Sequence, residues 1–171
     1  NQVGASRIGI EIEAALAFGT GHHGTTRGCL LLLDEILRKT RPTHVLDLGT
    51  GTGVLAIAAA KATRRRILAT DIDPRAALTA HENARLNGVG DLVETVCCKG
   101  FNAPRVADYA PFDLVLANIL ANPLKLLAKP MRTHLAPSAC VILSGLLPEH
   151  ANGVISAYRP YLTLNRRIEL E

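Results

Sequence analysis

The sequence predicts an α/β fold in which a doubly wound, mostly parallel sheet lies between two layers of helices, giving three layers. Two observations predict it. Short apolar, β-branched stretches alternate along the chain with longer segments of helical period, which is typical of a parallel sheet with helices on both faces. The chain has 171 residues, 48% of them hydrophobic, enough for one compact core. We therefore expect a single domain over residues 1–171.

The elements are expected in a regular order. Strands are expected at residues 44–48, 66–70, 93–97, 113–117 and 139–144, and helices at 54–62 and 75–86. Pro74 stands where the first turn of a helix tolerates proline, and Asn87-Gly88 is typical of a helix end. The segment 161–171 alternates like a late edge strand, and we expect the final edge strand of the sheet to be missing. Residues 44–171 then form the core, preceded within 1–43 by a strand, a loop and a helix.

The composition predicts a soluble protein of the cytoplasm that does not bind nucleic acid directly. A net charge of +4 and the run Arg64, Arg65, Arg66 would suit nucleic acid. These arginines, however, follow a predicted helix, where cations complement the exposed carbonyls, and the absence of Trp leaves little for base stacking. The four cysteines form no CxxC pair, which fits a reducing compartment. The chain shows neither a targeting segment nor an apolar run long enough to span a membrane.

The stretch VLDLGTGTG is the sharpest candidate site, because a buried strand runs through it into glycines and then into a helix. Gly49, Gly51 and Gly53 are spaced G-x-G-x-G, whereas a dinucleotide-binding turn needs glycine where Val54 stands. The pattern favours a ligand whose carboxylate and ammonium lie against the turn, with Asp47 near its cationic part. A tight turn without a ligand is the alternative.

Two polar residues end neighbouring strands. Asp71, 22 residues after Gly49, is placed to accept hydrogen bonds from ribose hydroxyls, whereas Asp73 before Pro74 suits a helix cap. Asn118 opens a loop at the carboxyl edge of the sheet, where its amide could hold an amine or amide group. The alternative for Asn118 is a turn-capping role.

The stretch AFGTGHHGTTRG, with four glycines and two adjacent histidines, lies just before a predicted helix. It lacks the spacing and the closing Gly-Lys-Ser/Thr of a phosphate-binding loop. Adjacent histidines such as His22 and His23 rarely bind one ion together, so no metal site is expected. We interpret the segment as a loop that folds over a ligand, with Phe18 as an apolar cover and Thr26 as a polar contact.

The motifs together carry a family resemblance. The glycine turn and Asp71 resemble class I S-adenosylmethionine-dependent methyltransferases. The set AFGTGHHGTT, DLGTGTGVLAIAA, DIDP, ENARLNG, ANILANPL and LSGLL resembles the bacterial methyltransferases of large-subunit ribosomal protein eleven, from about residue 16 onward. This resemblance implies a Rossmann-like catalytic domain without the family's N-terminal recruiting domain. It implies S-adenosyl-L-methionine as cofactor, S-adenosyl-L-homocysteine as product and no metal. The implied acceptors are amines of the ribosomal protein, namely lysine side chains and an N-terminal amine.

The resemblance also implies residue roles. It assigns cofactor contacts to Thr26, Gly49, Asp71 and Asn118, with Asn118 nearest to the chemistry and positioning the amine. His23 matches a histidine of the family, and Phe101 and Asn102 stand near the position where the superfamily often has an acidic residue. The full set of expected cofactor contacts is Thr26, Asp47, Gly49, Gly51, Gly53, Asp71 and Asn118, with Phe18, His23, Phe101 and Asn102 as additional candidates.

Two other functions remain open. One is an RNA or DNA methyltransferase acting on exocyclic amines, but such enzymes usually have an aromatic residue after Asn-Pro-Pro to stack a flipped base. Here Ile119 and Leu120 follow Asn118. The other is a cofactor-binding module without catalysis, or a dinucleotide oxidoreductase, against which Val54 weighs.

Overall fold

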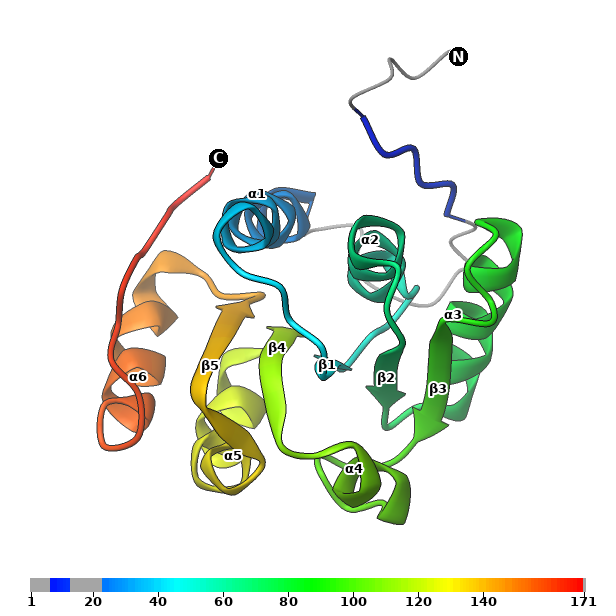
Figure 1. Ribbon diagram of the computed structural model, residues 1–171. Helices are drawn as coiled ribbons and strands as arrows, with labels where there is room; N and C mark the ends of the chain where they lie inside the picture. Colours follow the sequence, from blue (N-terminus) through cyan, green and yellow to red (C-terminus); the bar gives the residue numbers. More distant parts are fainter. Residues whose placement is uncertain (1–6, 13–22, 171) are drawn as a thin grey trace.

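The computed structural model describes residues 7–12 and 23–170, and its centre is a five-stranded sheet. The strands are β1 (Val45–Leu48), β2 (Ile67–Asp71), β3 (Val93–Cys97), β4 (Phe112–Asn118) and β5 (Leu135–Ser144). Their order is β3-β2-β1-β4-β5, visible from right to left in Figure 1, and every neighbouring pair is parallel. The predicted fold class is confirmed.

Within the described part of the chain, three helices cover each face of the sheet (Figure 1). One layer contains α1 (His23–Lys39), α2 (Val54–Thr63) and α3 (Pro74–Leu86), and the other contains α4 (Pro104–Tyr109), α5 (Ala121–Thr133) and α6 (Pro148–Tyr158). Successive strand residues point to opposite faces. Val45 and Leu114 therefore pack in the core beside α1–α3, whereas Leu46 and Val115 pack in the core beside α4–α6. Both faces of the central strands β1, β2 and β4 are buried, which explains why these strands are mostly apolar.

The helix ends agree with their sequence signals. Asp73 caps α3, accepting a hydrogen bond from the Arg75 N–H at 2.8 Å. Gly88 follows the end of α3 with a φ of 71°. Arg64 directly follows α2 and donates its N–H to the Ala60 carbonyl. The arginine run thus stands at a helix end, as expected.

The segment after α6 differs from its prediction. Residues 162–170 form no strand, so the prediction of a late edge strand is wrong. They run instead beside α1 and α6 (Figure 1), with the side chains of Ile168 and Leu170 lying close to Gly28. Alternating apolar residues can thus pack on a helix, so the pattern does not require a paired neighbouring strand.

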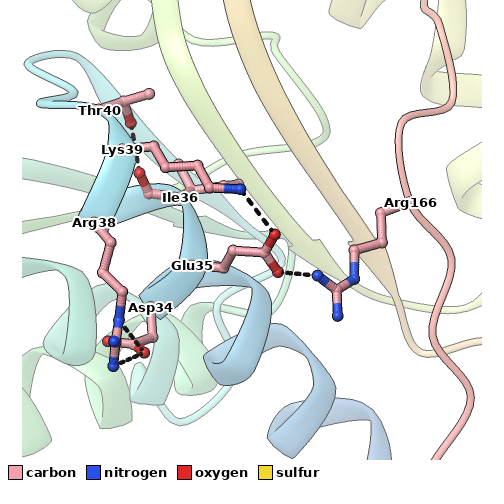
Figure 2. Close-up of polar contacts among 7 residues, drawn as sticks. All are labelled: Asp34, Glu35, Ile36, Arg38, Lys39, Thr40 and Arg166. Atoms are coloured by element: carbon pink, nitrogen blue, oxygen red, sulfur yellow. Dashed lines mark hydrogen bonds and ion pairs between the residues drawn. The ribbon is translucent and has the colours of Figure 1, made fainter.

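An ion pair connects this segment to α1, beside two pairs within the helix (Figure 2). Arg166 pairs with Glu35, which also pairs with Lys39 one turn later, and Asp34 pairs with Arg38. The hydrogen bond from Lys39, followed by that from Arg166, lowers the pKa of the Glu35 carboxyl. These pairs are exposed, so each contributes little to stability.

At the other end, the described residues 7–12 form no strand either and lie against α2 and α3. The Asn87 side chain accepts a hydrogen bond from the Glu11 N–H and donates one to the Glu11 carbonyl, and the Lys61 ammonium donates to the Gly9 carbonyl. The motif ENARLNG therefore supplies an anchor for the segment that precedes α1. Within the described residues, none of the helices is long and apolar enough to cross a membrane.

Candidate functional site

The strand order places the candidate residues at one edge of the sheet. The order reverses between β1 and β4, and ligands of such sheets bind at this reversal, beyond the carboxyl ends of the strands. In the strand register Leu48 lies between Thr70 and Ala117. The turn after β1 is therefore flanked by Asp71 at the end of β2 and Asn118 at the end of β4.

The three glycines of the turn have left-handed backbones but different surroundings. Gly49, Gly51 and Gly53 have φ values of 71°, 56° and 85°. A Cβ on Gly53 would lie 3.0 Å from the Ala80 Cα, so this glycine permits close packing of α3. A Cβ on Gly51 would meet no described atom within 4 Å. Gly51 therefore presents bare backbone to open space, where a ligand can approach closely.

Asp47 lies beneath this turn, with 1% of its surface exposed. Its Oδ2 accepts hydrogen bonds from the Thr50 hydroxyl at 2.6 Å and from the Ala56 N–H at 3.0 Å. It thereby satisfies a free N–H in the first turn of α2, whose N-cap Gly53 has no side chain to do so. Burial raises the pKa of the Asp47 carboxyl to about 6. Its Oδ1 is buried and has no partner among the described residues, leaving one acceptor for a ligand.

Asp71 connects the glycine turn to the end of β2. Its Oδ2 accepts the Gly51 N–H at 2.9 Å and its Oδ1 accepts the Asp73 N–H at 3.0 Å. Each carboxylate oxygen can accept a further hydrogen bond, so this geometry leaves capacity for ligand hydroxyls. The neighbouring Asp47 and Asp71 also repel each other, a smaller cause of the raised Asp47 pKa. Their summed negative charge suits a cationic ligand.

Asn118 meets Thr26 across the site. The Asn118 Nδ2 donates a hydrogen bond of 3.1 Å to the Thr26 hydroxyl, in the first turn of α1 and 92 residues earlier in the chain. The Asn118 Oδ1 is buried and, within the part of the chain that the structure describes, has no partner. An unpaired buried acceptor costs roughly 1–3 kcal/mol. It is thus a second acceptor available to a bound donor.

Two residues of the site were not predicted from the sequence. Ser144, at the end of β5, donates a hydrogen bond of 3.0 Å to the Thr25 carbonyl. Ile119 lies between two glycines: its Cγ2 stands 2.3 Å from where a Cβ of Gly49 would be, and its carbonyl oxygen 2.5 Å from where a Cβ of Gly145 would be. The signal for Ser144 was present, since it ends a strand at the same edge of the sheet as the other candidates.

The four additional candidates for cofactor contact stay predictions. The Phe101 ring is buried and stacks on His134, with ring centroids 4.5 Å apart, so it contributes to the core beside α5. Asn102 is exposed in a turn, where its N–H binds the Lys99 carbonyl. Phe18 lies outside the described residues, and His23 is the first residue of α1, without a described side chain. In the described ranges, no group of three or more His, Cys, Asp or Glu could hold a metal ion.

A separate apolar cavity of about 680 Å³ lies between α1, β5, α6 and residues 162–170. It is lined mainly by aliphatic side chains such as Leu32, Val141 and Ile155. Thr25 and Ser144 stand between this cavity and the carboxyl edge of β4. The cavity therefore borders the candidate site without containing Asp47, Asp71 or Asn118.

Comparison with known proteins relates this geometry to a family. A model of the family described as Ribosomal protein L11 methyltransferase (PrmA) matches residues 1–171. The ribosomal protein L11 methyltransferase of Rhodopseudomonas palustris is 68% identical over 158 residues, covering 92% of this chain and 54% of the relative. That of Bradyrhizobium diazoefficiens is 65% identical over 159 residues, covering 93% and 54%. The chain thus spans about half the length of these relatives.

Solved structures agree with the sequence relatives. The ribosomal protein L11 methylase of Lactobacillus delbrueckii subsp. bulgaricus superposes with a TM-score of 0.82 at 32% identity, over 95% of this chain and 80% of that one. An RNA methyltransferase of Salinibacter ruber, solved with S-adenosyl-L-homocysteine, has a TM-score of 0.56 at 28% identity, covering 66% and 73%. The family match over the whole sequence, together with these identities, shows that the chain belongs to the ribosomal protein L11 methyltransferase family.

Proposed function

We propose that this chain binds S-adenosyl-L-methionine at the carboxyl edge of β1, β2 and β4 and transfers its methyl group to amines of ribosomal protein L11. One observation carries the proposal. The Asn118 amide is fixed by Thr26 through its nitrogen, while its buried oxygen has no partner in the described chain. This is the arrangement expected of a group that accepts a hydrogen bond from a bound amine.

The described residues fit the cofactor chemically. The bare backbone of Gly51 permits close approach, and the Asp47 Oδ1 offers a buried acceptor for an ammonium group. Asp71 has spare acceptor capacity for the two ribose hydroxyls. The bound cofactor would supply an electrophilic methyl group on a cationic sulfur. The carboxylates of Asp47 and Asp71 favour that positive charge.

The acceptor amine must be neutral to attack the methyl carbon. Deprotonating a lysine of pKa near 10.4 at about pH 7.4 costs about 4 kcal/mol, and an α-amine of pKa near 8 costs under about 1 kcal/mol. The Asn118 Oδ1, by accepting one N–H, would direct the nitrogen lone pair toward the methyl carbon. Transfer of the methyl group from sulfur to nitrogen would leave S-adenosyl-L-homocysteine as product and the positive charge on the amine, whose excess proton would leave to solvent. Positioning thus provides the catalysis, and no covalent enzyme intermediate is needed.

A nucleic-acid acceptor is the second candidate, because the Salinibacter ruber relative is an RNA methyltransferase. The loop after β4 argues against it. The position of the aromatic ring that base-flipping enzymes use for stacking is the third residue after Asn118, and it is occupied here by the small, buried Ala121.

The two acceptors can be separated directly. The protein is incubated with methyl-labelled S-adenosyl-L-methionine and either purified ribosomal protein L11 or bulk ribosomal RNA. We expect the label in the protein, at lysine or the N-terminal amine after digestion and mass spectrometry. Label confined to the RNA would contradict the proposed acceptor, and failure to bind S-adenosyl-L-homocysteine would contradict the proposed cofactor.

A further inference from the structure

Two adjacent strands contact consecutive residues of α1. Asn118 and Ser144 are register partners at the ends of β4 and β5. The Asn118 amide binds the Thr26 hydroxyl, and the Ser144 hydroxyl binds the Thr25 carbonyl at 3.0 Å. The first turn of α1 is therefore held at two points by the carboxyl edge of the sheet.

A second residue of α1 lies near Ser144. Cys29, one turn after Thr25, is buried, and the nearby Ser144 hydroxyl partly offsets the effect of burial on the pKa of its thiol. Burial raises the pKa of this thiol to about 12, so it is neutral at physiological pH and adds no charge beside Ser144. The Ser144 side chain thus lies between two residues of the same helix face.

The loops beyond both strands also pack closely. A Cβ on Gly145 would lie 2.5 Å from the Ile119 carbonyl oxygen and 2.9 Å from its N and C atoms. The residue after Ser144 therefore lies directly against the residue after Asn118. The two strand ends are therefore closely packed, which limits movement of one against the other.

We infer that Ser144 is a positioning residue for the methyl transfer: by holding the first turn of α1, it fixes Thr26 and, through Thr26, the orientation of the Asn118 amide. The amide is planar, so fixing Nδ2 on Thr26 also fixes the direction of Oδ1, the acceptor that the proposed function assigns to the amine. Loss of the Ser144 hydroxyl frees the first turn to shift, and the Asn118 amide then rotates. This inference rests on the proposed function for its catalytic consequence and on the described contacts for its structural one.

The structural consequence is measured without any assay of activity. In protein labelled with ¹⁵N-asparagine, the Asn118 side-chain amide signal is identified by its loss in Asn118→Ala. We expect this signal to shift and its hydrogens to exchange with solvent more rapidly in Ser144→Ala, and to return toward the wild-type position in Ser144→Thr, which keeps the hydroxyl. Ser138→Ala, an exposed site on the same strand, is the matched control and leaves the signal in place.

The catalytic consequence is expected in kcat and not in the KM for S-adenosyl-L-methionine. We expect Ser144→Ala to lower kcat about tenfold, while its KM for S-adenosyl-L-methionine changes less than threefold. If Ser144→Ala does not fold, Ser144→Cys, with its weaker donor, gives the same measurements with smaller effects. An unchanged Asn118 signal in folded Ser144→Ala or Ser144→Cys would overturn the inference, whatever the activity. A shifted signal in a protein that neither binds cofactor nor transfers methyl would overturn the proposed function while leaving the positioning contact in place.

Discussion

Asn118 at the end of β4 and Thr26 in the first turn of α1 share a hydrogen bond of 3.1 Å, although 92 residues separate them in the chain. The bond connects two of the family-like motifs, ANILANPL and AFGTGHHGTT, at the same edge of the sheet as the glycine turn. It leaves the Asn118 Oδ1 without a partner among the described atoms. The site therefore has an oriented acceptor whose donor is expected to arrive with the substrate.

Asp71 is predicted to control cofactor affinity. Replacing it by asparagine removes the charge and turns one acceptor into a donor, so ribose hydroxyls lose part of their binding site. We expect Asp71→Asn to weaken S-adenosyl-L-homocysteine binding by about 10- to 100-fold, the range of a lost hydrogen bond to a charged group. Titration calorimetry measures it, with the exposed Asp91→Asn as control. Equal affinities in the two variants would remove Asp71 from the site.

Alanine substitutions at Gly51 and Gly88 distinguish the effect of backbone strain from that of ligand contact. Gly51 and Gly88 both have positive φ, and a Cβ on either would meet no described atom within 4 Å. We expect Gly51→Ala and Gly88→Ala each to lower the free energy of unfolding by about 1–2 kcal/mol from backbone strain. Only Gly51→Ala should also weaken S-adenosyl-L-homocysteine binding, because its methyl group enters the approach path. Equal affinity in both variants would mean that no ligand lies against Gly51.

Gly53→Ala tests the packing of the turn on α3. Its Cβ would press on the Ala80 backbone at 3.0 Å in addition to the strain of a φ of 85°. We expect a loss of about 2–4 kcal/mol in the free energy of unfolding, larger than that of Gly51→Ala. Urea denaturation compares the two variants, and a smaller loss for Gly53→Ala would contradict the observed packing.

Asp47 gives the stability a defined pH dependence. Its pKa is about 6 in the folded protein against an ordinary value of 3.8, so between these values the folded state holds more protons than the unfolded state. The stability that protonated Asp47 provides is therefore fully present below about pH 4 and is lost as pH rises through about 6, by up to about 3 kcal/mol. Asp47→Asn lacks this titration, so its stability relative to the wild type should increase between about pH 4 and pH 7. A constant difference across that range, in urea titrations, would show that Asp47 is not strained by burial.

Local patterns in the sequence were sufficient to predict the sheet and to place several candidate residues at one edge of it. The central strands β1, β2 and β4 are mostly apolar because both of their faces are covered. Gly49 directly follows β1, and Asp71 and Asn118 end β2 and β4. Since parallel strands end at one edge, the convergence of these residues follows from the pattern of strands alone. The meeting of Asn118 with Thr26 depended on the family resemblance, which named both residues but not their contact.

What the sequence did not predict depends on contacts between distant segments. Ser144 is placed in the site by its hydrogen bond to Thr25, 119 residues earlier. Ile119 is placed there by packing against Gly49 and Gly145, which lie in other loops. The stacking of the Phe101 ring on His134 likewise joins two distant segments, while the contact of Phe101 with the cofactor stays a prediction. The tail has the alternation of a strand, yet ion pairing with Glu35 and packing beside Gly28 place it against α1 instead. The hydrophobic periodicity of the local sequence predicts none of these contacts.

The proposed role of Asn118 is tested most directly by the effect of Asn118→Ala on methyl transfer to ribosomal protein L11, measured beside S-adenosyl-L-homocysteine affinity. The control is Asn122→Ala, an exposed asparagine four residues later on α5. We expect Asn118→Ala to lower kcat by about 100-fold through lost positioning and to reduce cofactor affinity far less, whereas Asn122→Ala should change neither. An unchanged kcat in Asn118→Ala would contradict the assignment of Asn118 as the group that orients the acceptor amine.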